Sequence, residues 1–211
     1  MDSTPSQRSQ RRGAKKRPGF DFTGRMRLLC HDMTRRVPEL GHIDVERMAV
    51  SFSQTRKSVA HGMYASLTPM RFAGGATSTV RGGRTMGIQR LEDDHGREML
   101  YILSFYLPRF LDLDFREKLT TIVHELWHVS PRFDGDVRRF RGRCYAHSGS
   151  QKNFDAVAER LADDWLSLKP PSDLYEFLHH GYRKLSELHG AIYGTKIPTP
   201  KLYPLGKGYE R

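Results

Sequence analysis

The amino-acid sequence predicts an α+β fold, in which a small and mostly antiparallel sheet packs on one central helix and on further helices. Four short segments have the alternating or continuous apolar character of strands, at residues 43–53, 62–72, 85–91 and 98–106. The segment that follows them, residues 114–128, repeats apolar residues at three- and four-residue steps, as a helix does. A second stretch with this helical period covers residues 154–168.

Length and composition indicate one domain with two tails. The 211 residues fit a single domain, and a hydrophobic content of 37% is low for a fully folded chain of this size. We therefore expect a disordered basic tail at residues 1–19 and a single folded domain at residues 20–190. An extended C-terminal tail is expected at residues 191–211, where prolines alternate with basic residues.

Three further segments complete the predicted order of elements. A helix is expected at residues 22–37, which carry apolar residues three or four apart and end before Pro38. Residues 74–83 are rich in Gly, Ser and Thr and predict a mobile loop. A last helix is expected from Ser172 to His189, with one apolar stripe that packs over the domain.

The net charge of +11 is concentrated at the N-terminus. Residues 1–19 hold six basic residues against Asp2, a net charge of +5. Such a segment favours anionic partners, nucleic acid first and an acidic membrane surface second. A solvated tail without a dedicated partner explains the same charge equally well.

Two features bear on the compartment. The N-terminal tail lacks the apolar core of a secretory signal, and the chain has no run of 18 apolar residues, so we expect no membrane association. Cys30 and Cys144 form no C-x-x-C pair, which favours a reducing compartment over a disulfide framework or a zinc ribbon. The sequence thus favours a cytoplasmic protein.

The motif that carries chemistry is His-Glu-Leu-Trp-His at residues 124–128. Two histidines four residues apart lie on one face of a helix, where both imidazoles can bind one zinc ion. Glu125 stands between them and is placed to deprotonate a water that the metal activates. The helical context supports this interpretation, because Asp114 and Glu117 form a capping box and Pro131 follows the second histidine.

A catalytic zinc site needs a third protein ligand, and three downstream residues are candidates. Asp134 lies six residues after His128. Glu159 lies on the helix at residues 154–168, but on the side opposite its apolar face. His147 lies in a loop of small residues before that helix, where the backbone can bring an imidazole to the metal. The sequence favours His147 and leaves Glu159 and Asp134 open.

Taken together, these segments resemble the SprT-like zinc metalloprotease domain. The apolar strand before the motif helix, HELWHVSPRFDGD and the later YAHSGS carry the resemblance, which covers roughly residues 40–168. The two longer motifs are also similar to bacterial and phage proteins described as metallopeptidases. The resemblance implies a zincin-like fold, Zn²⁺ held by His124, His128 and His147, and Glu125 as the catalytic residue. The chain departs from SprT-like proteins because it lacks their C-terminal cysteine zinc ribbon.

Two functions follow as expectations. The first is a zinc-dependent metallopeptidase that hydrolyses peptide bonds with a water activated by Glu125, acting on a protein or peptide substrate, with proteins bound to nucleic acid as one candidate class. The second is a non-catalytic, zinc-containing DNA-binding or phage accessory protein on the same scaffold. Nucleic acid could bind the basic tail and an arginine cluster after the motif, at Arg132, Arg138, Arg139, Arg141 and Arg143. Pairing of these arginines with Asp134 and Asp136 is the alternative.

Overall fold

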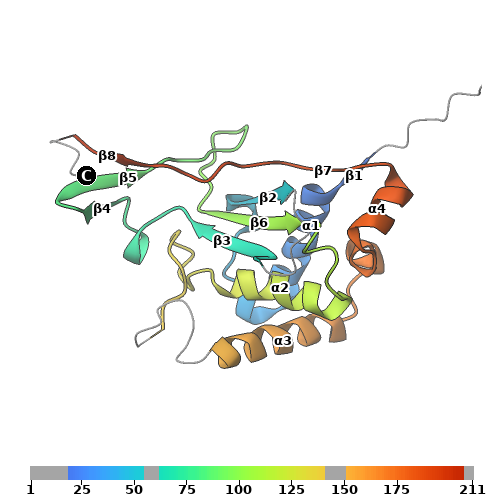
Figure 1. Cartoon of the computed structure of the whole chain (residues 1–211). Helices are drawn as coiled ribbons and strands as arrows, with labels where there is room; N and C mark the ends of the chain where they lie inside the picture. Colours follow the sequence, from blue (N-terminus) through green and yellow to red (C-terminus); the bar gives the residue numbers. More distant parts are fainter. Residues whose placement is uncertain (1–18, 55–61, 141–150, 207–211) are drawn as a thin grey trace, which may run out of the picture.

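The computed structural model describes residues 19–54, 62–140 and 151–206. Within them the fold is mixed α+β, as predicted, but the strands form three small sheets rather than one (Figure 1). Residues 1–18 of the predicted basic tail lie outside the described residues.

The central sheet has the strand order β2-β6-β3. It is built from β2 (Met48–Gln54), β6 (Tyr101–Leu107) and β3 (Ala65–Pro69). The prediction of a mostly antiparallel sheet is wrong here, because β2 pairs with β6 in parallel and only β3 is antiparallel to β6. β6 overlaps the strand predicted at residues 98–106, and five of its seven residues are buried in this central position.

A second sheet is antiparallel and has the order β4-β5-β8. Its strands are β4 (Ser78–Arg81), β5 (Arg84–Ile88) and β8 (Leu202–Pro204). The prediction of a loop at residues 74–83 is therefore wrong for residues 78–81, which form β4. Gly82 and Gly83 have φ of 56° and 73°, which is the backbone of a two-residue hairpin turn. The glycines that suggested a loop in fact join two strands.

The helices before and after the central sheet agree with their sequence signals. Helix α1 (Phe22–Arg36) is capped at its N-terminus by Asp21, whose side chain accepts a hydrogen bond from Gly24 N–H. Helix α2 (Phe115–Trp127) begins with the predicted capping box of Asp114 and Glu117. Helix α3 is longer (Gln151–Ser167), and in Figure 1 α2 lies between the central sheet and α3. Leu168, the last residue of the helix predicted at residues 154–168, lies just beyond α3 and is 47% exposed.

The predicted helix at residues 172–189 is wrong over its first half. The chain forms 3₁₀ turns at Ser172–Leu174 and Glu176–His179, and only Tyr182–His189 is α-helical (α4). A buried lysine on α2 explains the interruption. The ammonium of Lys118 donates to the carbonyl oxygens of Leu178 (2.7 Å) and His180 (3.0 Å), which therefore do not pair within a continuous helix. Other short 3₁₀ turns are Pro38–Leu40, Val45–Arg47 and Ala73–Gly75.

The C-terminal segment is extended over residues 191–206, and it pairs with strands of the folded domain. β7 (Ile192–Tyr193) is parallel to β1 (Phe20–Asp21), and β8 is antiparallel to β5. In Figure 1 this segment runs along the top of the molecule from β7 to β8. In the part of the chain that the structure describes, no helix combines the length and the apolar character needed to cross a membrane.

Replacing Lys118 tests the role assigned to it. Lys118 is 2% exposed, and burial lowers the pKa of its ammonium group. Lys118→Met should lower the free energy of unfolding by about 2–3 kcal/mol, because two carbonyl groups lose a charged donor. Urea unfolding followed by circular dichroism measures this. Lys184→Met, at an exposed position on α4, is the control and should change it by less than about 0.5 kcal/mol.

Candidate metal centre

The two motif histidines converge at the C-terminal end of α2. His124 lies in its last turn and His128 is its C-cap residue. Their Nε2 atoms are 3.1 Å apart. Two nitrogens bound to one tetrahedral zinc ion at 2.0–2.1 Å would be about 3.3 Å apart, so the pair fits the metal. The same separation also suits an N–H···N hydrogen bond between the two rings, in which a proton takes the place of the cation.

Helix α3 supplies the groups that hold these imidazoles. Asp155 Oδ1 lies 3.0 Å from His124 Nδ1, which orients the opposite nitrogen toward His128. The ring of Phe154 stacks on His128, with centroids 4.4 Å apart, and meets His124 edge-on at 4.8 Å. Both histidines are therefore positioned by two consecutive residues of α3.

The sequence reasoning missed Asp155. Its signal was present, because Asp155, Ala158 and Ala162 follow one another at helical spacing. Ala158 and Ala162 are buried, and their small side chains let α3 come close to α2. A carboxylate on the same face as two buried alanines can then reach His124.

Asp134 and Asp136 were the carboxylates considered at this end of the motif, and the structure places them in a turn. Gly135 between them has φ of 84°, as a D-G turn requires. Asp136 accepts hydrogen bonds from Gly74 N–H and from Arg139. Asp134 pairs with Arg132 at 2.9 Å. Burial opposes ionisation of both carboxyls, but hydrogen bonds hold the pKa of each below its usual range, chiefly the bond from Ser130 to Asp134 and the bond from Arg139 to Asp136.

Glu125 lies on the same turn of α2 as His124, but its carboxyl group is in a less polar environment than those of Asp134 and Asp136. Burial raises the pKa of its carboxyl group to about 7, and a hydrogen bond from the backbone N–H of Leu67 on β3 opposes that rise. The carboxyl group is thus enclosed between α2 and the outer strand of the central sheet. A carboxyl group with a pKa near neutrality can both accept and return a proton.

The outer edge of β3 faces this carboxyl group. Met70 N–H donates to the carbonyl of Leu100 on the inner side of the strand. Backbone groups alternate in direction along a strand, so the even-numbered residues of β3 face β6 and the odd-numbered ones face outward. The bond from Leu67 to Glu125 agrees with this assignment. The outward-facing residues are Ala65, Leu67 and Pro69.

The three candidates for the third ligand lie in different places. His147 lies outside the described residues. Glu159 is exposed on α3 and lines a cavity of about 470 Å³ beside the first half of α2, together with Asp163. Asp134 is held in the turn by Arg132. Within residues 19–54, 62–140 and 151–206, no three His, Cys, Asp or Glu side chains are grouped to hold a metal.

The segment that contains His147 begins and ends beside the histidines. It joins Phe140 to the start of α3 at Gln151. The ring of Phe140 lies 6.0 Å from that of Phe154, which stacks on His128.

The arginines that follow the motif contact other residues of the chain, where the structure describes them. Arg132 pairs with Asp134, and Arg139 pairs with Asp136 at 2.7 Å. Arg138 donates to the carbonyl of Trp127 and stacks over its indole ring at 3.6 Å. Arg141 and Arg143 lie outside the described residues. The alternative of pairing with Asp134 and Asp136 is confirmed for Arg132 and Arg139.

Comparison of the chain with protein-family models, with curated proteins and with solved structures gives no match.

A substitution at Asp155 tests the metal centre. Asp155→Ala should weaken zinc binding by about 10–100-fold, because His124 loses the group that orients it. Competition with a chromophoric chelator measures the affinity. Asp164→Ala removes an exposed carboxylate of α3 that pairs with Arg160, and it should leave the affinity unchanged. Equal affinities for the two variants would contradict the role given to Asp155.

Proposed function

We propose that this chain is a zinc-dependent metallopeptidase with a zincin-like fold. The observation that carries the proposal is the convergence of the Nε2 atoms of His124 and His128 at 3.1 Å beside a half-buried Glu125 that faces an outer strand. Two neutral imidazoles and a nearby carboxyl group are the side chains that zinc-assisted hydrolysis requires. The absence of a match to known proteins leaves the proposal to rest on these contacts.

Each residue has a separate role in this proposal. His124 and His128 would hold the ion, with His147 as the third ligand. When bound, zinc would lower the pKa of water and polarise the carbonyl of the scissile bond. Glu125 accepts the proton of the attacking water at its carboxylate and passes it to the leaving amine. Asp155 keeps His124 Nδ1 engaged, so that Nε2 remains the coordinating atom.

The outer edge of β3 provides a place for the substrate. An extended peptide can pair with the outward backbone groups of Ala65 and with the carbonyl of Leu67, as an added strand of the central sheet. Such pairing uses backbone groups alone, so it positions the peptide bond without selecting its side chains. Leu67 is also the residue that donates to Glu125, which places the bound peptide beside the proposed base.

Nucleic-acid association and a cytoplasmic location remain parts of the proposal. The basic charge of residues 1–19 supports nucleic-acid association, whereas Arg132 and Arg139 are already paired within the protein. A chain that binds zinc and DNA without hydrolysis is the second function to test. The two functions differ in their need for Glu125.

Glu125→Gln separates these functions. The variant should lose at least about 100-fold in peptidase activity, because an amide cannot accept the proton. Its zinc content should remain equal to that of the wild type. Cleavage of an unfolded protein substrate, with and without DNA, is the measurement. If the wild type is inactive in both conditions while it binds zinc and DNA, the non-catalytic function replaces the peptidase.

Zinc content also identifies the third ligand. His147→Ala should lower stoichiometric zinc binding sharply, whereas Glu159→Ala and Asp134→Ala should not, because both carboxylates face away from the histidine pair or are paired elsewhere. Elemental analysis of the purified proteins measures this. His95→Ala, in an exposed turn, is the matched control. A metal-free wild type would overturn the metal centre as a whole.

A further inference from the structure

The central sheet has a second outer edge, on the side away from β3, and it belongs to β2. The carbonyl of Arg47, just before β2, accepts from Leu100 N–H on the side of β6. Phe52 N–H points the other way and donates to the carbonyl of Thr195, at 3.0 Å. The even-numbered residues of β2 therefore direct their backbone groups outward.

The C-terminal segment covers this edge only in part. After Thr195 it leaves the strand, since Ile197 N–H donates to the hydroxyl of Ser51 at 2.9 Å. Across the described ranges of the chain, no backbone group pairs with the outward N–H or C=O of Val50. Val50 is 7% exposed, so these groups lie in a recess. Unpaired strand edges of this kind accept an added strand.

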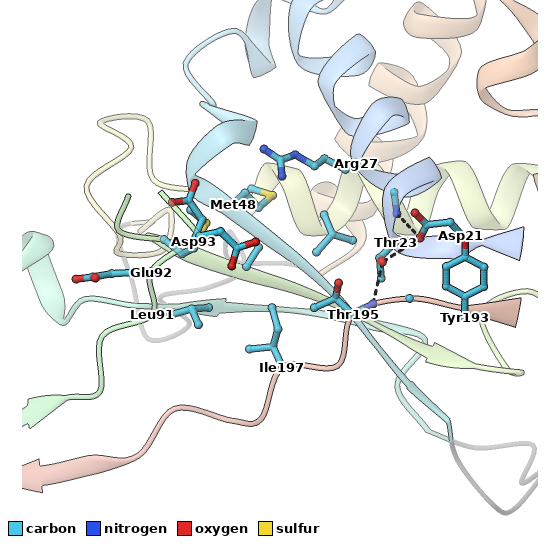
Figure 2. A pocket seen from close by; sticks show the side chains of 16 residues that line it. Asp21, Thr23, Arg27, Met48, Leu91, Glu92, Asp93, Tyr193, Thr195 and Ile197 are labelled. Atoms are coloured by element: carbon cyan, nitrogen blue, oxygen red, sulfur yellow. Dashed lines mark hydrogen bonds between the residues drawn. The ribbon is translucent and has the colours of Figure 1, made fainter. Parts of the chain in front are cut away.

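A groove of about 480 Å³ lies over this edge (Figure 2). Its floor is β2 from Met48 to Val50. Its sides are the start of α1, the C-terminal segment and the turn at residues 91–94. The apolar side chains that line it are those of Met48, Val50, Leu91, Met99 and Ile197. The groove therefore joins an open backbone edge to an apolar surface, which suits an extended peptide.

The rim of this groove is acidic, although the chain as a whole has a net charge of +11. Figure 2 shows Asp21 at one end, and Glu92 and Asp93 at the other. Asp94 lines the groove beside them. Arg27 is the single basic residue among those that line it, and it pairs with Glu46 at 2.7 Å. The groove thus favours a cationic occupant.

We propose that residues 1–18 of this chain bind in the groove as an added strand beside Val50, with their basic side chains against Glu92 and Asp94. These residues have a net charge of +5, which complements the rim. They lead into β1 at Phe20, and the next residue, Asp21, lines the groove.

The length of the segment is sufficient for this. Residues 12–19 span up to about 24 Å when extended, and β2 rises about 13 Å from Met48 to Phe52, so the segment is long enough to turn back near Asp21 and run along this edge. A tethered segment also has a high effective concentration, so weak ion pairs and a few backbone bonds suffice to hold it. When bound, the segment withholds its arginines from other anionic partners.

Photo-crosslinking of the full chain tests this inference. Gln10 is replaced by p-benzoylphenylalanine, the protein is irradiated at low concentration, and the products are mapped by mass spectrometry. We expect cross-links within one chain to Met48, Val50 or Met99. The double variant Glu92→Lys with Asp94→Lys should lower their yield about fivefold, the effect of two exposed ion pairs. Asp93 is left in place because it accepts from His95 N–H and Arg97 N–H in its own turn.

The matched control is Asp173→Lys with Glu176→Lys. These exposed residues line a different cavity, beside Phe20, and their reversal changes the charge by the same amount. It should leave the yield unchanged. Cross-links that fall elsewhere on the chain, that join two copies only, or that fall equally in both double variants would overturn the inference.

Discussion

The packing of α3 against α2 is the contact on which the candidate site depends. Buried Ala158 and Ala162 let the two helices come close, and Phe154 and Asp155 then contact both histidines. Without α3, the imidazoles of α2 would be free to turn into solvent, since one helix orients only their Cα–Cβ bonds. The proposed zinc site therefore belongs to a pair of helices.

The central sheet presents two outer edges in different surroundings. The edge of β3 faces Glu125 and the histidine pair, and its backbone is placed for a substrate. The edge of β2 faces an acidic groove and is partly covered by the C-terminal segment. Natural sheets protect their edges from unwanted pairing. Here one edge would be reserved for a transient peptide and the other for segments of the chain itself.

Many charged side chains of this protein contact other groups of the same chain. Two arginines after the motif pair with carboxylates in one turn, where they stabilise the chain between α2 and the segment leading to α3. Lys118 is buried and holds two carbonyl groups of the 3₁₀ turns before α4. A net charge of +11 therefore does not describe any one surface, and the groove beside β2 is acidic.

The sequence alone determined the elements whose signals are local. The capping box of α2, the period of α1 and the i, i+4 spacing of His124 and His128 depend only on neighbouring residues, and the structure agrees with each. Contacts between distant segments decided the rest. Asp155 reaches His124 because two helices pack, and the helix expected at residues 172–189 is interrupted where Lys118 takes its carbonyl groups. Local periodicity cannot reveal such partners, because they are brought together only when the chain has folded.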